Sequence, residues 1–274
     1  MEESSAGLKG PELPKQPRDA KAFRIDPWWG LVALVIGLII ILVVISPDPY
    51  KRIVMFVRDG IGVTLITTVL SFILVLFVGL VGGLGRLAKN RLINGLATLY
   101  VELIRGVPLL VQLIWWYFAF PSVLNEIGKV SNIEALSRYK ANPIAMAVLG
   151  LTMCYGAYMS EIYRAGIQSI PAGQMEAARS LGMSYFQAMR NIILPQAVRV
   201  ILPPVGNEFI SLLKDSSLVS VVAVTDLTRR GREFMSTTFL PIPTWTMVAL
   251  IYLVMTLFSA RMVSYLERKT HFDR

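Results

Sequence analysis

Residues 60–85 read GIGVTLITTVLSFILVLFVGLVGGLG and contain no Asp, Glu, Lys or Arg. A helix needs about 20 apolar residues to cross the hydrocarbon core of a bilayer. The stretches 106–125, 141–160 and 234–260 also lack all four charged residue types, and residues 27–50 contain only Asp48. The pattern predicts an all-α, polytopic membrane protein.

Composition agrees with this class and excludes several others. Hydrophobic residues make up 54% of the 274 residues and charged residues only 16%, against about 25% charge in soluble domains. The net charge of +9 comes from basic residues in short connections, so we expect no nucleic-acid partner. The chain has one cysteine, Cys154, and one histidine, His271, which excludes an intramolecular disulfide and a His/Cys metal cluster. We therefore expect no metal site.

Six membrane spans are predicted. They cover about 28–46, 61–83, 96–120, 143–160, 200–224 and 244–265. The first follows a polar tail of 27 residues and has no small-residue cleavage site, so we expect a retained anchor rather than a signal peptide. The fifth is the most polar and contains Pro203-Pro204, which predicts a break in its helix.

The distribution of Lys and Arg orients these spans. Six spans place both termini on one side, and sixteen basic residues fall on that side against nine on the other. Because cytoplasmic loops carry the excess of basic residues, we expect both termini and the connection 161–199 in the cytoplasm. The expected tails are 1–27 and 266–274.

The long connection contains an amphipathic, bent segment. Ala178, Leu181, Tyr185, Met189 and Ile192 recur at spacings of three and four, which indicates helix. Gly182 interrupts this stripe, as a glycine that closes a helix does. Ser184 and Gln187 form the S-x-x-Q pattern that caps the start of a helix. We expect one short helix that ends near Gly182, a tight turn, and a second helix that leads to Pro195.

Two interpretations of this segment are open from the residues alone. It is either an interfacial helix on the lipid headgroups or a surface that docks in a groove of another protein. Its start, QMEAA at 174–178, is small and acidic, whereas membrane-surface helices favour Lys or Arg with bulky apolar residues. This composition favours docking on a protein.

The same stretch carries a family resemblance. The segment GQMEAARSLGMSYFQAMRNIILPQA, 173–197, resembles the EAA signature, E-A-A-x-x-x-G followed by I-x-L-P, of permease subunits of bacterial ABC importers. The segments GVTLITTVL, YVELIRGVPLLVQL, AYMSEIYRAGIQSIPAG and ILPPVGNEFISLLKDSSLVSV extend the likeness over about 60–265. Together they resemble the polar-amino-acid branch, which includes the histidine and glutamine permeases.

The resemblance implies a function, a fold and partners. It implies a type I importer permease domain at 60–265, with an EAA coupling region at 173–195 that is seated in a groove of a cytoplasmic ATPase dimer. ATP and Mg would be bound by that partner, and this chain would hold no cofactor. The other implied partners are a second permease subunit, identical or related, an extracytoplasmic binding protein, the amino-acid substrate and membrane lipid. The residues expected to couple to the ATPase are Gln174, Glu176, Ala177, Ala178, Arg179 and Gly182.

One departure from the family pattern stands out. The family core has five spans with an extracytoplasmic N-terminus, whereas this chain adds the span 28–46 and brings its N-terminus inside. The added segment is apolar on all faces, which favours contact with lipid.

Charged residues in the fifth span indicate a polar stripe. Five residues project within about 120° of a helix: Asn207, Glu208, Ser211, Lys214 and Asp215. Charge inside a membrane is costly, so it needs a functional or structural reason. A stripe with both signs suits a water-filled path for a zwitterion. An internal ion-pair network, such as Lys214 with Asp215, is the equally weighted alternative.

Three more residues are path candidates from their positions. Tyr158 and Glu161 share a face at the cytoplasmic end of the fourth span, where Glu161 could also be a solvated terminus. Gln112 lies deeper in the third span than Arg105, which we interpret as a snorkelling residue in an i,i+3 ion pair with Glu102.

The sequence contains no motif for catalysis. Gly79, Gly82, Gly83 and Gly85 are followed by no Lys-Ser/Thr, so they indicate close helix packing rather than a phosphate loop. We find no combination of nucleophile, base and acid, and expect no catalytic residues and no ATPase site. An ATP-independent secondary transporter or channel is the alternative function, and an intramembrane enzyme is a further one.

Overall fold

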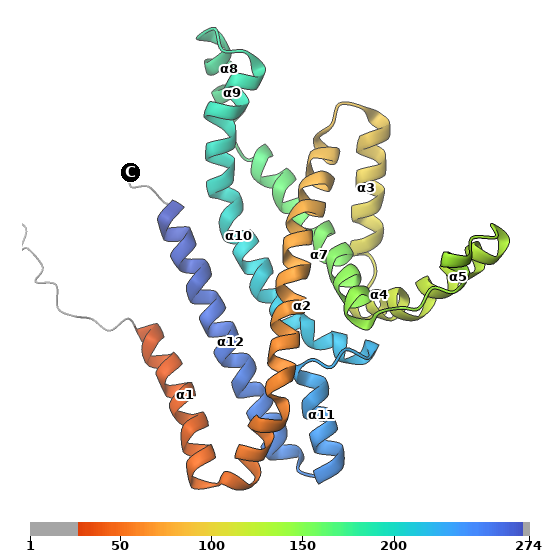
Figure 1. Cartoon of the computed structure of the whole chain (residues 1–274). Helices are drawn as coiled ribbons and strands as arrows, with labels where there is room; N and C mark the ends of the chain where they lie inside the picture. Colours follow the sequence, from red (N-terminus) through yellow and green to blue (C-terminus); the bar gives the residue numbers. More distant parts are fainter. Residues whose placement is uncertain (1–26, 271–274) are drawn as a thin grey trace, which may run out of the picture.

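The computed structural model describes residues 27–270; the ends of the two predicted tails, 1–26 and 271–274, lie outside the described residues. All regular structure in 27–270 is helical. The helices are α1 (Pro27–Ile45), α2 (Pro47–Leu87), α3 (Arg91–Arg105), α4 (Leu109–Ile114), α5 (Phe120–Val130), α6 (Glu134–Ser137), α7 (Pro143–Gln168), α8 (Ala172–Ser180), α9 (Tyr185–Ala188), α10 (Leu194–Asp215), α11 (Leu227–Thr238) and α12 (Pro241–Thr270). Two π-helical segments (Trp115–Ala119 and Met189–Ile193) and a 3-10 segment (Ser216–Val222) connect them. Figure 1 shows their arrangement.

Within residues 27–270, four helices are long and apolar enough to cross a membrane, namely α1, α2, α7 and α12. The helix pair 91–105 and 109–130 would be a fifth span if it is counted as one. The chain is therefore an all-helical, multi-pass membrane protein. Helix α10 covers most of the predicted fifth span but is not among these four, because its prolines and polar residues lower its mean hydropathy.

The predicted third span at 96–120 is sharply bent. Helix α3 ends at Arg105, and the following segment 109–130 turns away from it by 103°. Pro108 cannot donate a backbone hydrogen bond and disfavours helical backbone in the residue before it, so the helix ends at this point. Helix α4 packs against α7, and α5 extends away from the bundle (Figure 1).

Helix α2 begins 14 residues before the predicted start at 61. It has 41 residues, and proline at its first turn suits a helix start. Its additional turns are helical because Ile53 and Val57 are fully buried against α11 and α12. At 1.5 Å per residue the helix is about 60 Å long, roughly twice the thickness of the hydrocarbon core.

The predicted break at Pro203-Pro204 is also wrong, because α10 continues through both prolines to Asp215. Proline has a helical φ, and α10 is held on two sides by close contacts. A Cβ on Gly206 or on Gly166 of α7 would overlap Val263 or Ile201 respectively. Tight packing against α12 and α7 thus keeps the helix continuous.

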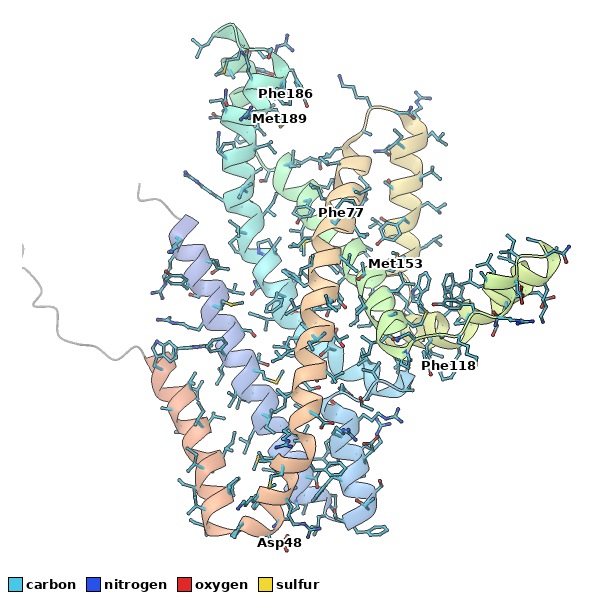
Figure 2. The ribbon with its side chains drawn as sticks, viewed as in Figure 1. Asp48, Phe77, Phe118, Met153, Phe186 and Met189 are labelled. Carbon is cyan, nitrogen blue, oxygen red and sulfur yellow. The ribbon has the colours of Figure 1, made fainter. Side chains whose placement is uncertain are left out.

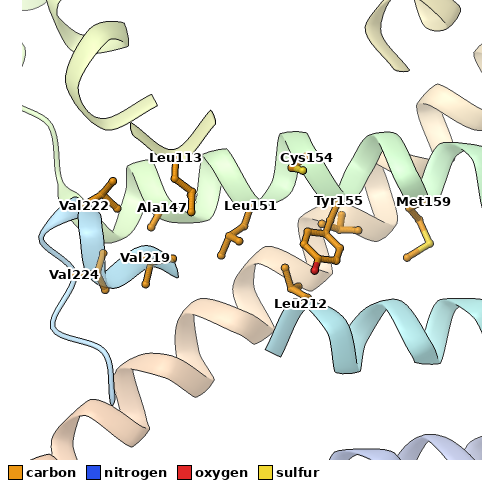
Figure 3. Close-up of a cluster of buried hydrophobic side chains, with 11 residues drawn as sticks. Leu113, Ala147, Leu151, Cys154, Tyr155, Met159, Leu212, Val219, Val222 and Val224 are labelled. Carbon is orange, nitrogen blue, oxygen red and sulfur yellow. The ribbon is translucent and has the colours of Figure 1, made fainter. Parts of the chain in front are cut away.

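The largest core cluster lies where α2, α7 and the end of α10 meet, and Figure 3 shows its side chains. Leu151, Met159 and Leu212 are fully buried there. The glycines of α2 allow the close approach: a Cβ on Gly83 would lie 2.9 Å from the carbonyl oxygen of Ser160. The prediction that these glycines serve helix packing is confirmed.

Helix α1 lies against α12 at the edge of the bundle (Figure 1). Val32 and Val35 pack on Leu257, and the Trp28 indole N–H donates to the Leu257 carbonyl over 3.3 Å. Only 11% of the apolar window 28–45 is buried. Its outer surface is therefore apolar and available to lipid.

Candidate functional site

The predicted bent segment after α7 is present and is closed by a Schellman motif. Helix α8 ends at Ser180, and Gly182 follows in the left-handed region at φ +84°. The Gly182 N–H donates to the Arg179 carbonyl (3.0 Å) and the Met183 N–H donates to the Ala178 carbonyl (3.2 Å). These two bonds satisfy the last carbonyls of the helix and fix the direction of the turn.

The second half of the segment begins with the predicted capping box. The Ser184 hydroxyl accepts from the Gln187 N–H (3.2 Å), and the Gln187 side-chain oxygen accepts from the Ser184 N–H (2.8 Å). Helix α9 then runs through a π-helical segment into α10. We call residues 172–188 the foot. Both of its turns are built from local contacts, so its shape follows directly from its sequence.

The foot exposes most of the residues predicted to couple to an ATPase. Gln174, Glu176, Ala177, Arg179 and Gly182 are exposed, whereas Ala178 is buried. The foot also exposes three large side chains, Leu181 (85%), Phe186 (71%) and Tyr185 (58%). In Figure 2 the foot projects at the opposite end of the molecule from Asp48. Exposed apolar side chains rimmed by polar residues mark a surface that contacts another protein or a membrane.

A second set of polar residues lies between α3, α7 and α10. The Tyr155 hydroxyl donates to Asp215 Oδ2 over 2.7 Å. The ring of Tyr158 is 6.3 Å from that of Tyr155, and the Arg105 guanidinium lies 5.2 Å above the Tyr158 ring. Glu208 is half-buried and within electrostatic range of both Arg105 and Asp215. The set combines one cation, two carboxylates and two phenols.

The other predicted path residues of α10 differ in exposure. Asn207 and Lys214 are exposed, and Ser211 is half-buried. Among the ion pairs of residues 27–270, none joins Lys214 to Asp215, which bonds Tyr155 instead. The alternative of an ion pair between these neighbours is therefore wrong.

Glu161 belongs to an ion-pair network, which we call the clamp. It accepts from Arg164 Nε over 3.0 Å and also pairs with Arg86 of α2. Arg86 reaches Glu102 of α3 as well, at 3.6 Å, so the clamp joins α2, α3 and α7. The predicted pair of Glu102 with Arg105 is wrong because each side chain has a different partner on another helix.

Gln112 is buried at the bend between α3 and α4 rather than exposed along α3. Only 5% of it is accessible, and its amide donates to the carbonyls of Ile104 and Val107. Its contacts are thus with the backbone of the bend.

The sequence interpretation missed three residues of these clusters. The sequence assigns Arg105 to snorkelling and gives Arg86 and Tyr155 no role in a site. The spacing of Tyr155 three residues before Tyr158 was the available signal, since both lie on one face of α7. The partners of Arg86 and Arg105 depend on tertiary contacts that spacing does not give.

The described residues 27–270 contain no group of three or more His, Cys, Asp or Glu side chains placed to hold a metal ion. The polar clusters instead offer fixed charges and hydrogen-bond donors. Such groups are of the kind that can bind and orient a polar solute.

Comparison with known proteins places these features in one family. Residues 75–272 match the family model described as binding-protein-dependent transport system inner membrane component. The chain is 34% identical over 273 positions to the arginine transport system permease protein ArgU of Corynebacterium glutamicum, covering 94% of this chain and 84% of that protein. It is 36% identical over 211 positions to the glutamine transport system permease protein GlnP of Escherichia coli K12, covering 77% and 91%.

A solved structure agrees in fold. The crystal structure of an amino acid ABC transporter with histidines superposes with a TM-score of 0.70 at 37% identity, over 82% of this chain and 97% of that one. Residues 75–272, which the family model matches, contain α3, α7, the foot, α10 and α12. The chain therefore belongs to the family of inner membrane components of binding-protein-dependent transport systems.

Proposed function

We propose that the chain, the permease subunit of an ABC importer for amino acids, is driven through its foot and carries a polar amino acid past the Arg105–Tyr155–Asp215 cluster. ATP is hydrolysed by a separate partner subunit, and this chain is not itself an enzyme. The protein is a multi-pass component of the inner membrane.

The exposed foot is the observation that carries the coupling proposal. Gln174, Glu176, Ala177 and Arg179 form an open polar surface beside Leu181, Tyr185 and Phe186. Ala178 contributes by close packing inside the foot, and Gly182 sets its bend. A groove on the cytoplasmic ATPase dimer that covers these apolar side chains would bury them while the two turns keep the foot rigid.

The path proposal rests on the mixed charges between α3, α7 and α10. An amino acid has an ammonium and a carboxylate, which need partners of opposite sign. Glu208 and Asp215 suit the ammonium, and Arg105 suits the carboxylate. Tyr158, Asn207, Ser211 and Lys214 extend this polar surface, and Glu161 lies at its cytoplasmic end in the clamp. Gln112 supports the path from the bend rather than lining it.

The assembly proposal follows the family pattern. A second permease subunit, identical or related, would complete the path, and an extracytoplasmic binding protein would deliver the amino acid. Helix α3 supports a large apolar contact surface for a second subunit or lipid, because Leu92, Leu96, Leu99 and Leu103 are each more than half exposed.

The topology proposal keeps six spans with both termini in the cytoplasm. Helix α1 is the additional span 28–46, and α3 and α10 serve as the third and fifth spans. The permease domain occupies 60–265 with its coupling region at 173–195, and the tails 1–27 and 266–274 are cytoplasmic. The excess of basic residues on the side of the foot supports this orientation.

Copurification tests the coupling proposal. We expect the wild-type permease to retain its ATPase, and Glu176→Arg or Gly182→Trp to lose it. Glu126→Arg, a charge reversal on exposed α5, is the matched control and should retain the ATPase. Retention by all variants, or amino-acid uptake by the permease alone in liposomes without ATP, would overturn the proposal.

A further inference from the structure

The bend between α3 and α4 leaves a backbone carbonyl without its usual partner. In a continuous helix the carbonyl of Ile104 would accept from the N–H four residues later. That residue is Pro108, which has no N–H. The Ile104 carbonyl instead accepts from the Val107 N–H over 3.4 Å, a long bond that leaves it able to accept from a second donor.

Gln112 provides this donor. Its Nε2 lies 2.8 Å from the Ile104 carbonyl oxygen and 2.8 Å from the Val107 carbonyl oxygen. Its backbone N–H also donates to the Pro108 carbonyl over 3.1 Å, which starts α4. One residue thus bonds both sides of the 103° bend.

Gln112 is a buried polar side chain, so its amide needs hydrogen-bond partners inside the protein. The side chain is 5% exposed and lies 3.6 Å from the sulfur of Cys154 on α7. The two carbonyl acceptors require the NH₂ group on their side, which leaves Oε1 buried without a hydrogen-bond partner in the described part of the chain. A buried unpaired oxygen costs free energy, which the two hydrogen bonds donated by the same amide offset. The amide is useful because it holds the bend.

The end of α3 held by this amide carries Arg105. Its guanidinium lies 5.2 Å above the Tyr158 ring and within electrostatic range of Glu208. The preceding turns are held by buried Val101 and by the Tyr100 hydroxyl, which donates to the Met153 carbonyl over 2.7 Å, whereas Arg105 lies at the end of the helix beyond them. We infer that Gln112 is a positioning residue for transport, which replaces the missing N–H of Pro108 and so keeps Arg105 beside Tyr158. This inference rests on the proposed path.

Uptake by the complete importer in proteoliposomes, with its ATPase and binding protein, tests the inference. Gln112→Met has nearly the same volume but no donor, and we expect a roughly tenfold rise in the KM for binding protein loaded with amino acid. Assembly with the ATPase should remain. Cys154→Ala, which removes only the third contact of the amide, is the matched control and should transport as wild type.

A double mutant separates positioning from simple folding. If Gln112 acts through Arg105, then Gln112→Met adds nothing to the defect of Arg105→Ala. Additive defects, or normal uptake by an assembled Gln112→Met complex, would overturn the inference. Should Gln112→Met fail to assemble, Gln112→Asn, which is one methylene too short to reach both carbonyls, gives the same comparison. If Arg105→Ala itself transports normally, the proposed path fails and the inference fails with it.

Discussion

The phenol of Tyr155 donates a 2.7 Å hydrogen bond to Oδ2 of Asp215 and thereby ties α7 to the last residue of α10. The chain continues from Asp215 directly into the 3-10 segment, so this bond holds the point where α10 ends. Tyr155 also belongs to the core cluster with Leu151 and Leu212 (Figure 3). Tyr155, whose ring is packed in the core, thus fixes the position of the Asp215 carboxylate on the proposed path.

Removing the bond and removing the charge should have different effects. Tyr155→Phe leaves Asp215 without its donor, and we expect a loss of about 1–3 kcal/mol in stability together with reduced uptake. Asp215→Asn keeps an acceptor for Tyr155 but has no charge, so uptake should fall with little change in thermal stability. Melting curves and uptake assays of the purified importer check both. Equal melting temperatures for Tyr155→Phe and wild type would contradict the assigned role of the bond.

The left-handed turn of the foot can be tested with a pair of glycines. Gly182→Ala places a Cβ at φ +84°, which we expect to cost about 1–2 kcal/mol in the conformation of the foot and to weaken ATPase binding. Gly173→Ala, in helical α8 with no atom within 4 Å of its new Cβ, should leave binding unchanged. Titration of detergent-solubilised permease with the ATPase measures both affinities. A weaker complex with Gly173→Ala than with Gly182→Ala would contradict the prediction.

A second glycine pair tests the packing of α2 on the segment before α11. A Cβ on Gly60 would lie 2.9 Å from backbone atoms of Asp226 and Leu227, which cannot move aside as a flexible side chain can. Gly60→Ala should therefore destabilise the protein by about 1–3 kcal/mol. Gly62→Ala meets no atom within 4 Å and is the control. Thermal melting of the two variants should differ by several degrees, and similar melting temperatures would refute this packing.

The clamp should contribute to stability through Arg86. Its side chain is only 13% exposed, and Arg86→Met leaves Glu161 and Glu102 without their link to α2. We expect a loss of about 1–3 kcal/mol, since hydrogen bonds to charged groups are of this size. Arg91→Met removes an exposed cation at the start of α3 and should have little effect. Denaturation of both purified variants is the measurement, and equal stabilities would argue against the clamp.

Acid should weaken the ion pairs within α11. Glu233 lies in α11, which is not among the candidate membrane spans, and it pairs with Arg229 and Arg230. Partial burial raises the pKa of Glu233, but the hydrogen bonds from Arg229 and Arg230 outweigh it and lower the pKa below its ordinary 4.5. Because the folded value is the lower one, this stabilisation is present at neutral pH and is lost as the pH falls through the folded pKa.

The test of this pH dependence compares wild type with Glu233→Gln. The wild type should melt at the higher temperature near pH 7, and the difference should shrink towards about pH 3. Thermal melts across this range provide the measurement. A difference that grows on acidification would reverse the sign and refute the assignment.

The foot could be predicted in detail because its structure depends on neighbours in sequence. A Schellman turn at Gly182 and a capping box at Ser184 and Gln187 involve residues at most five positions apart. The glycines of α2 were also informative, since small residues on one helix face indicate close contact in any fold. Such features need no knowledge of the tertiary structure.

The errors concern features that other helices decide. Pro203-Pro204 suggested a break, but packing of Gly206 against Val263 holds α10 together. Glu102 and Arg105 have ideal helical spacing, yet Glu102 bonds Arg86, which lies on another helix. The rule that proline ends a helix could have predicted the bend at Pro108. The uncharged run 106–125 instead suggested that the span continues through it. Hydropathy identifies apolar segments and does not give their direction.

After the non-helical backbone at Asp48, α2 continues without a break from Pro49 to Leu87. Near its start, Asp59 accepts from Arg230 Nε of α11 over 3.0 Å, and near its end Arg86 enters the clamp. A rigid rod of about 60 Å acts as a lever: a tilt of about 5° about one end moves the other by roughly 5 Å. In the proposed mechanism, a swing of α2 imposed at the clamp would therefore also displace the end that contacts α11, without a separate relay.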